Sequence, residues 1–364
     1  MKKLALITLA SFMTASAWGQ SSSSTNVPLY TSGYLSLPYG GAPGMSDAAS
    51  LLGKTVNATA FSITDLEQGS RLLLKTLPSF GGESGPESFV SGVAGMHRLN
   101  ENTTVLAEFS YYQAGNAELR DNEGNELGFF QPSENNIKVG VVQRFSESFR
   151  AGVKLGYNST NLGSSFSSAV IRENALLVDF SADYTKELGN GELVAFWGLN
   201  NIGKKNSFSE DNLAYMPTQM SLGALYSLEL NEAIKLSPNL TFQKFLVPST
   251  PIRNADGSIL MGQEQPLGLF AAMFGSFSDA PNGTSEEVQE WRTLIGTEAL
   301  INDKVYVAVS ASLESQDKGN RQFVSFGTGV NFNKTSVGLG YFVSTNQNAI
   351  FYNGMSSINI CFTL

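Results

Sequence analysis

Few residues in this sequence could act in acid–base or nucleophilic chemistry. His97 is the only histidine of the 364 residues, so a Ser-His-Asp hydrolase would have to use it as the general base. Ser91 and Ser110 are the nearest hydroxyl nucleophiles, but no spacing selects either of them. We therefore predict no catalytic residue and expect His97 to lie at the rim or in the lumen.

The sequence also has few side chains that could bind a metal ion or take part in redox chemistry. A zinc site needs clustered nitrogen and sulfur ligands, and the chain has one histidine and one cysteine, Cys361. A single cysteine also rules out an internal disulfide. Residues 121–126 (DNEGNE) and 254–257 (NADG) could bind calcium loosely, yet neither has the full twelve-residue ligand pattern. We predict turns at both places, no metal site and no cofactor.

Partner binding is the chemistry that the loops favour. Phe129 and Phe130 lie in the middle of a long polar stretch, residues 114–135, and aromatic side chains dominate interface hot spots. The alternative is that the two rings pack on a rim or belong to an extended strand. A second candidate is the stretch 202–216, and the partner-binding residues that we predict there are Lys204, Lys205, Phe208, Tyr215 and Met216.

The segments that must position these loops alternate apolar residues with small or polar ones, so their hydrophobicity repeats every two residues. Residues 305–313 alternate valine, alanine and leucine with small or polar residues, and residues 324–332 and 337–343 do the same. One face of each run is apolar, as in a half-buried strand. Runs of about 9–11 residues suit tilted strands that cross an apolar layer of roughly 25 Å. The pattern predicts an all-β fold, a transmembrane antiparallel β-barrel.

Composition agrees with this fold. Hydrophobic residues make up 42% of the chain, yet beyond the N-terminus no apolar run reaches the length of a membrane helix. The 24 phenylalanines and 12 tyrosines suit rings that face lipid and form interfacial girdles. The net charge of −9 argues against nucleic-acid binding, which needs a basic surface.

The N-terminus has the pattern of an export signal. Lys2 and Lys3 precede a short apolar core, and Ala17 and Gly19 are small residues at the cleavage-reading positions. We predict a signal peptide at 1–19 and an N-terminal extension at 20–68, which contains a short capped helix and either plugs the barrel or forms a loose periplasmic arm. We assign 69–364 to the barrel and the mature protein to the cell outer membrane.

Fifteen segments fit the strand pattern. Charged residues such as Lys154, Asp179 and Asp183 fall on the face that we assign to the lumen, because a charge facing lipid is costly. The segments are 69–78, 88–98, 103–113, 136–146, 149–158, 174–185, 192–201, 217–230, 233–246, 267–277, 290–301, 304–314, 321–332, 335–345 and 353–364.

The number of segments is inconsistent with a closed barrel. Bacterial barrels have an even number of strands, with short turns at the periplasmic end and long loops outside. Counting from the front of the chain puts residues 247–266 outside, whereas counting from the end puts them inside. Either a crossing between 247 and 289 is missed or spurious, or the first segment is not part of the wall. The pattern alone leaves fourteen or sixteen strands open.

Several short blocks follow one another in the second half of the chain. They are 201–205 (NIGKK), 216–217 (MP), 244–251 (KFLVPSTP), 274–283 (FGSFSDAPNG), 285–287 (SEE), 313–315 (LES), 318–323 (KGNRQF) and 327–329 (GTG). In this order the blocks resemble the PorV family of the type IX secretion system, and the resemblance covers roughly residues 190–345.

The resemblance implies a fourteen-stranded barrel similar to fatty-acid-transporter barrels. It further implies a binding and shuttling function rather than an enzyme. Such a protein would bind the C-terminal signal domains of secreted cargo at a large translocon channel and pass them to an attachment complex with a sortase-like peptidase. Outer-membrane lipid would surround it.

Two other functions remain as alternatives. A transporter of hydrophobic compounds, of the fatty-acid type, would need an apolar lumen, and the lumenal residues that we predict are mostly small or charged. A lipid A acyl hydrolase would need His97.

Overall fold

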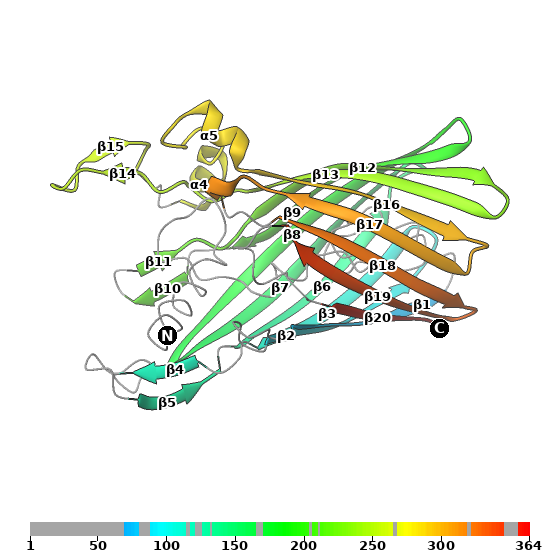
Figure 1. Ribbon diagram of the computed structural model, residues 1–364, viewed down its shortest axis with the longest axis horizontal. Coiled ribbons are helices and arrows are strands. Elements are labelled where there is room, and N and C mark those ends of the chain that lie inside the picture. Colours follow the sequence, from blue (N-terminus) through cyan, green and yellow to red (C-terminus); the bar gives the residue numbers. More distant parts are fainter. Residues whose placement is uncertain are drawn as a thin grey trace.

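Fourteen strands follow one another around the wall of a closed barrel in this computed structural model (Figure 1). The residues that the structure describes are 69–79, 88–113, 117–120, 126–131, 133–164, 170–203, 206–209, 212–264, 268–318, 322–345 and 356–364. The predicted signal peptide at 1–19 and extension at 20–68 lie outside these residues and stay predictions.

Every strand of the wall is antiparallel to its neighbours, and β1 pairs with β20 to close the ring. The closed antiparallel barrel was therefore predicted correctly. The wall strands are β1 (Ser70–Ser79), β2 (Ser88–Arg98), β3 (Thr103–Gln113), β6 (Ser133–Arg144), β7 (Phe149–Ser164), β8 (Val170–Leu188), β9 (Gly191–Gly203), β12 (Gln219–Asn231), β13 (Ile234–Phe245), β16 (Trp291–Ile301), β17 (Val305–Leu313), β18 (Phe323–Phe332), β19 (Thr335–Ser344) and β20 (Ser356–Thr363).

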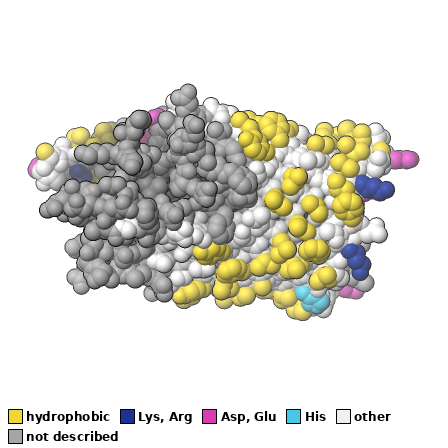
Figure 2. Space-filling view, turned by 60° about the horizontal axis from the view of Figure 1, so that its bottom comes forward, with side chains coloured by type: hydrophobic (Ala, Val, Ile, Leu, Met, Phe, Trp, Pro, Cys, Tyr) yellow, Lys and Arg dark blue, Asp and Glu magenta, His cyan; other side chains and the backbone are white. Residues whose placement is uncertain are grey.

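The two-residue period sorts side chains between lipid and lumen as predicted. On β17, Val305, Val307 and Val309 are exposed on the outer surface, whereas Tyr306 and Ser310 are buried inside. The outer face of the wall thus carries a belt of apolar side chains. Figure 2 shows part of this belt, with charged side chains gathered at its right-hand end.

One of the fifteen predicted segments, residues 267–277, is wrong. Residues 267–277 do not cross the membrane, because α4 (Leu269–Gly275) forms there instead. Removing this segment leaves an even number of strands and places all of 246–290 at one end of the barrel. The first segment, β1, does belong to the wall.

The two ends of the barrel differ in the length of their connections. Short turns at 99–102, 145–148, 189–190, 232–233, 302–304 and 333–334 lie at one end. The longer connections lie at the other, which outer-membrane barrels direct outward, and we call it the outer end. Within the described residues it carries three two-stranded hairpins and three short helices: β4 (Ala117–Arg120) with β5 (Glu126–Phe130), β10 (Asn206–Ser209) with β11 (Asn212–Ala214), β14 (Ile252–Arg253) with β15 (Ile259–Met261), and α4, α5 (Thr284–Gln289) and η1 (Gln316–Lys318).

The lumenal face is charged where β3, β6, β7 and β8 meet. Asp179 accepts a hydrogen bond of 2.6 Å from Lys138 and lies 3.7 Å from Lys154, which also pairs with Glu108 at 3.2 Å. The Asp179 carboxylate also accepts the backbone N–H of Asn201, at a shift in the β8–β9 register. The charges predicted for the lumen therefore face it. Among the described residues, no helix is long and apolar enough to span a membrane.

Candidate partner-binding site

The longest described connection at the outer end joins β13 to β16 over residues 246–290, and we call it the outer loop. It contains the β14–β15 hairpin, α4 and α5, which gather at the outer end of the barrel in Figure 1. Three of the sequence blocks that carry the PorV resemblance, 244–251, 274–283 and 285–287, fall within it or at its start.

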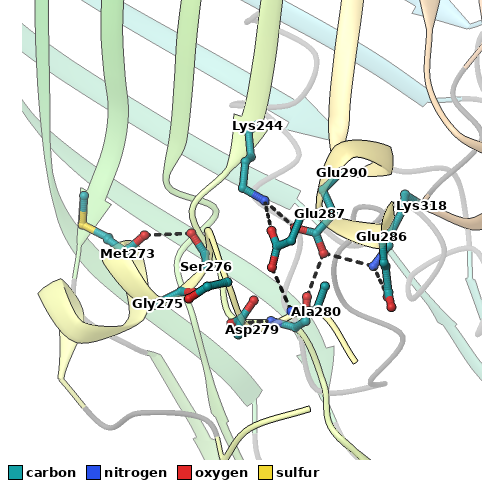
Figure 3. A network of polar contacts seen from close by, with 12 residues as sticks. Lys244, Met273, Gly275, Ser276, Asp279, Ala280, Glu286, Glu287, Glu290 and Lys318 are labelled. Atoms are coloured by element: carbon teal, nitrogen blue, oxygen red, sulfur yellow. Dashed lines mark hydrogen bonds and ion pairs between the residues drawn. The ribbon is translucent and has the colours of Figure 1, made fainter. Parts of the chain in front are cut away.

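A buried lysine fixes this loop to the wall. Lys244, at the outer end of β13, has no exposed surface and donates hydrogen bonds to the carboxylates of Glu287 in α5 and Glu290 just after it (Figure 3). Burial raises the pKa of Glu290, but the hydrogen bond and charge of Lys244 lower it overall. Glu290 is therefore held as the anion that neutralises Lys244.

A second lysine ties the outer loop to the next connection. Lys318 of η1 donates hydrogen bonds to Glu286 at 2.5 Å and to Glu290 at 3.0 Å. Burial lowers the pKa of Lys318, but the hydrogen bonds and charges of the two carboxylates raise it overall. The residues that the PorV resemblance singled out at 285–287 and 318–323 thus meet in space.

Backbone groups complete the network. The carboxylate of Glu287 accepts the N–H of Ala280 at 2.8 Å, and that of Asp279 accepts the N–H of Ser249 at 3.0 Å. The hydroxyl of Ser249 donates to Glu290 at 2.8 Å. Because each bond joins segments 7 to 41 residues apart, the network holds the two halves of the outer loop together.

Asp279 is the group in this network with the most altered acidity. Burial raises its pKa to about 6; the hydrogen bond from Ser249 opposes the rise and the nearby charges of Glu287 and Glu290 increase it. Burial, together with the charge of Asp279, also raises the pKa of Tyr215 to about 12. One part of this site therefore changes charge close to neutral pH.

α4 presents an aromatic face to the surroundings. Ala272 and Met273 are buried, and Ala272 packs with Tyr215, Phe245 and Val247. One turn apart on the opposite side, Phe270 and Phe274 are 66% and 73% exposed. The helix carries no charged residue. An exposed, uncharged pair of rings on a fixed helix has the composition of an interface hot spot.

The partner-binding residues predicted from the sequence lie in different places. Tyr215 and Met216 are buried, and Met216 packs with Ala175 and Leu177. Phe208 lies on β10, whereas Lys204 and Lys205 fall outside the described residues.

Phe129 and Phe130 form the end of β5, which agrees with the extended-strand alternative for these two residues. Nothing in the described structure tests partner binding by the residues predicted in the two loops, so their role stays a prediction.

Sequence reasoning missed the α4 face because it read 267–277 as a strand. Two signals were available. Leu269, Ala272 and Met273 follow helical spacing, and Gly268 and Gly275 bound the run. Lys244 also continues the lipid-facing row of Leu240 and Phe242, where a charge requires a cover.

His97 and the two serines do not form a hydrolase site. His97 is exposed near the end of β2, and its Nδ1 shares a hydrogen bond of 2.8 Å with the hydroxyl of Ser70. Ser91 lies six residues away on the same strand and donates to Thr76, while Ser110 is buried on β3.

The described residues contain no group of three or more histidine, cysteine or acidic side chains that could hold a metal ion. The predicted turn at 254–257 is present: Asp256 accepts hydrogen bonds from the backbone N–H and the hydroxyl of Ser258. Residues 121–125 of the other predicted turn lie outside the described part of the chain.

The family comparison supports the resemblance found in the sequence. The family model described as type IX secretion system protein PorV matches residues 82–253, just under half of the chain. The resemblance to PorV is confirmed. The match runs from β2 to β14, so it includes Lys244 at the start of the resembling block 244–251 and ends before α4 and α5. PorV is a secretion-system component of the outer membrane and not an enzyme family.

Solved structures and curated proteins give the remaining comparisons. The Pseudomonas putida toluene transporter TodX is 10% identical over 81% of this chain and 90% of its own, with a TM-score of 0.46. The monoaromatic hydrocarbon channel CymD is 9% identical over 89% and 94%, with a TM-score of 0.48. A Pseudomonas aeruginosa FadL homologue is 8% identical over 81% and 90%, with a TM-score of 0.42. No curated protein matches the sequence.

Proposed function

We propose that this PorV-like barrel binds the C-terminal signal domains of secreted proteins at its outer end and shuttles them from the translocon channel to a sortase-like attachment complex. The observation that carries the proposal is the exposed aromatic face of α4, Phe270 and Phe274, held on a fixed outer loop. The PorV resemblance supplies the class of partner.

A fixed loop favours this use of the aromatic pair. Ordering a mobile loop on binding costs free energy, and a loop already held in one conformation avoids that cost. Lys244 and Lys318 hold α5 through buried ion pairs, and α4 packs on Tyr215 and Val247. The two phenylalanines can therefore enter a partner groove without prior folding of the loop.

The loops predicted from the sequence lie at the same end of the barrel as α4. Phe208 lies on β10, and the β4–β5 hairpin carries Phe129 and Phe130. Lys204 and Lys205 precede β10 in sequence. We propose that these loops contact the translocon or the attachment complex while α4 holds the cargo.

The alternative of a hydrophobic-compound transporter gains less support. An apolar substrate needs an apolar path, and Lys138, Lys154 and Asp179 are buried on the lumenal face. The hydrolase alternative needs His97 near a nucleophile and an orienting carboxylate, and the hydrogen-bond partner of His97 is Ser70.

A double substitution tests the proposal. Phe270→Ser with Phe274→Ser removes the aromatic face without touching the ion network. We expect the variant to lose binding of the C-terminal signal domains of secreted proteins. The measurement is a pull-down of the barrel from native membranes, with mass spectrometry of the bound proteins. Leu260→Ser, which removes an exposed apolar side chain from the β14–β15 hairpin, is the matched control and should retain cargo.

Full cargo capture by the Phe270→Ser, Phe274→Ser variant would exclude α4 as the cargo site. Loss of capture only in variants of Phe129, Phe130 and Phe208 would place the cargo on the hairpins instead. A protein that purifies from native membranes with neither cargo nor translocon would contradict the secretion function altogether.

A further inference from the structure

The lipid-facing row of side chains on β13 ends in a lysine, Lys244, whose side chain is buried under another part of the chain. Successive outward residues of this strand are Leu240 and Phe242, both exposed as in the rest of the apolar belt. Lys244 comes next in the same row, because side chains two apart share a face. Its side chain is nonetheless fully buried. Part of the chain must therefore lie against the outside of the wall at this point.

The cover consists of residues 277–290, which we call the brace. Glu287 and Glu290 contact the Lys244 ammonium, and the ring of Phe277 lies with its centroid 5.7 Å from the same nitrogen. Figure 3 shows Lys244 reaching from the wall strand towards these glutamates. The brace therefore sits on the lipid side of β13, outside the barrel.

The strand register gives the level of the brace along the wall. Lys244 pairs directly with Trp291 on β16. Trp291 shares the outward row of Ile295, which is exposed in the apolar belt. Tryptophan in such a position at the end of a membrane strand marks the boundary between lipid and water. The brace therefore lies at the level of the outer-leaflet headgroups.

The outer surface of the brace lacks free charge. Its four acidic residues are Asp279, Glu286, Glu287 and Glu290, and all of them accept hydrogen bonds inside the network. Its exposed residues are uncharged, and the apolar ones are Phe277 and Val288, which are 41% and 66% exposed. The remaining exposed residues are Ser278, Asn282, Gly283, Thr284 and Ser285.

We propose that the brace is a membrane-interface element, with Phe277 and Val288 resting in the headgroup–acyl boundary of the outer leaflet beside β13 and β16. The brace begins where the exposed row of Leu240 and Phe242 ends, because the ring of Phe277 lies against Lys244, the next residue of that row. An aromatic and an aliphatic side chain flanked by uncharged polar residues suit this boundary. The inference requires a barrel in a membrane and is independent of cargo binding.

Site-directed fluorescence in lipid nanodiscs tests the proposal on the full chain. In a Cys361→Ala background, single cysteines Val288→Cys, Leu240→Cys and Ser258→Cys carry an environment-sensitive dye. Leu240 on the lipid-facing row of β13 and Ser258 at the tip of the exposed β14–β15 hairpin are the matched lipid and water controls. Folding of each variant is checked by its heat-modifiable mobility in SDS gels.

We expect the dye at 288 to be quenched by lipids that carry a doxyl group near the headgroup and to resist aqueous iodide, as the dye at 240 does. Adding Lys244→Met should release the brace and restore iodide quenching at 288. Iodide quenching at 288 equal to that at 258 in the unreleased protein would overturn the proposal. Protection from both quenchers would also overturn it, because a protein partner or a second copy would then cover the surface.

Discussion

The ammonium group of Lys244 contacts the carboxylate of Glu290, and neither side chain has any exposed surface. The two residues are 46 positions apart, on a wall strand and at the end of α5. Removing one partner of a buried ion pair leaves the other charge without compensation, which costs about 3–5 kcal/mol. This contact should therefore decide whether the outer loop stays on the wall.

Lys244→Met should release the outer loop while the barrel remains folded. The wall strands keep their backbone ladders, whereas Glu287 and Glu290 lose their contacts with Lys244 and Glu290 keeps its contact with Lys318. A loss of about 3–5 kcal/mol raises the open fraction of the loop about 100-fold or more. Chymotrypsin cleavage within 246–290 should accelerate accordingly, while the heat-modifiable mobility of the barrel in SDS gels should not change.

Lys235→Met on the same strand is the control for this prediction. Lys235 is 43% exposed and pairs with Glu229 at 3.3 Å, and exposed ion pairs contribute only about 0–1 kcal/mol. Its loop cleavage should match that of the unmodified protein. Equal cleavage rates for both variants would mean that the Lys244 contacts do not hold the loop.

The outer loop should lose stability as the pH rises towards neutral. Burial raises the pKa of Asp279 from 3.8 to about 6, so the folded loop binds this proton more tightly than the unfolded loop does. Asp279 therefore stabilises the folded loop most when it is protonated and least when it is ionised. This stabilising free energy is lost as the pH rises from about 4 to about 6. Hydrogen exchange of residues 246–290, corrected for the intrinsic rate, should show less protection at about pH 8 than at about pH 5.

Asp279→Asn provides the matched test. An asparagine oxygen can still accept the N–H of Ser249, but it cannot ionise. The variant should be better protected than the unmodified protein at neutral pH and should show a smaller pH dependence in this range. An unchanged pH profile would assign the titration to another group.

The barrel could be predicted from the sequence because its signal is local. Each strand alternates on its own, and the predicted bounds 88–98 and 103–113 coincide with β2 and β3. The α4 segment failed because a short apolar run fits a strand as well as a helix. The odd strand count nevertheless located the fault between 247 and 289, where α4 lies.

The candidate site could not be predicted in the same way. Its contacts join Lys244 to Glu287 and Lys318 to Glu286 across 43 and 32 residues, and no periodicity records such pairs. The PorV resemblance named most of these residues in separate blocks without saying that they meet. Tyr215 and Met216 were predicted as partner-binding residues of a loop, but loop position alone does not reveal that both side chains are buried.

Asp179→Asn should weaken the barrel itself. Lys138 and Lys154 share the Asp179 carboxylate inside the lumen, and the backbone of Asn201 has a left-handed φ of 58° where it donates to the same group. Loss of this buried charge should cost about 3–5 kcal/mol. The measurement is the temperature at which the folded band converts to the unfolded band in SDS gels.

Asp303→Asn serves as the surface control for the lumenal prediction. Asp303 is 60% exposed and lies 3.9 Å from Lys235. Its conversion temperature should stay that of the unmodified protein, since exposed pairs contribute little. A conversion temperature for Asp179→Asn that also stays unchanged would show that the lumenal network does not support the wall.

Gly338→Ala should destabilise the wall through one specific clash with Tyr306. A β-carbon at 338 would lie 1.9 Å from the Tyr306 hydroxyl oxygen and 3.2 Å from the ring carbon that bears it. That hydroxyl is buried without a hydrogen-bond partner in the described structure, so Tyr306→Phe should stabilise by about 1 kcal/mol. Gly338→Ala alone should cost about 1–3 kcal/mol, and much less in the Tyr306→Phe background.

Unfolding titrations of the two single variants and the double variant in urea give the coupling free energy. Gly275→Ala, where the new β-carbon meets open space, controls for a general effect of glycine replacement, and an equal cost of Gly338→Ala in both backgrounds would contradict the clash.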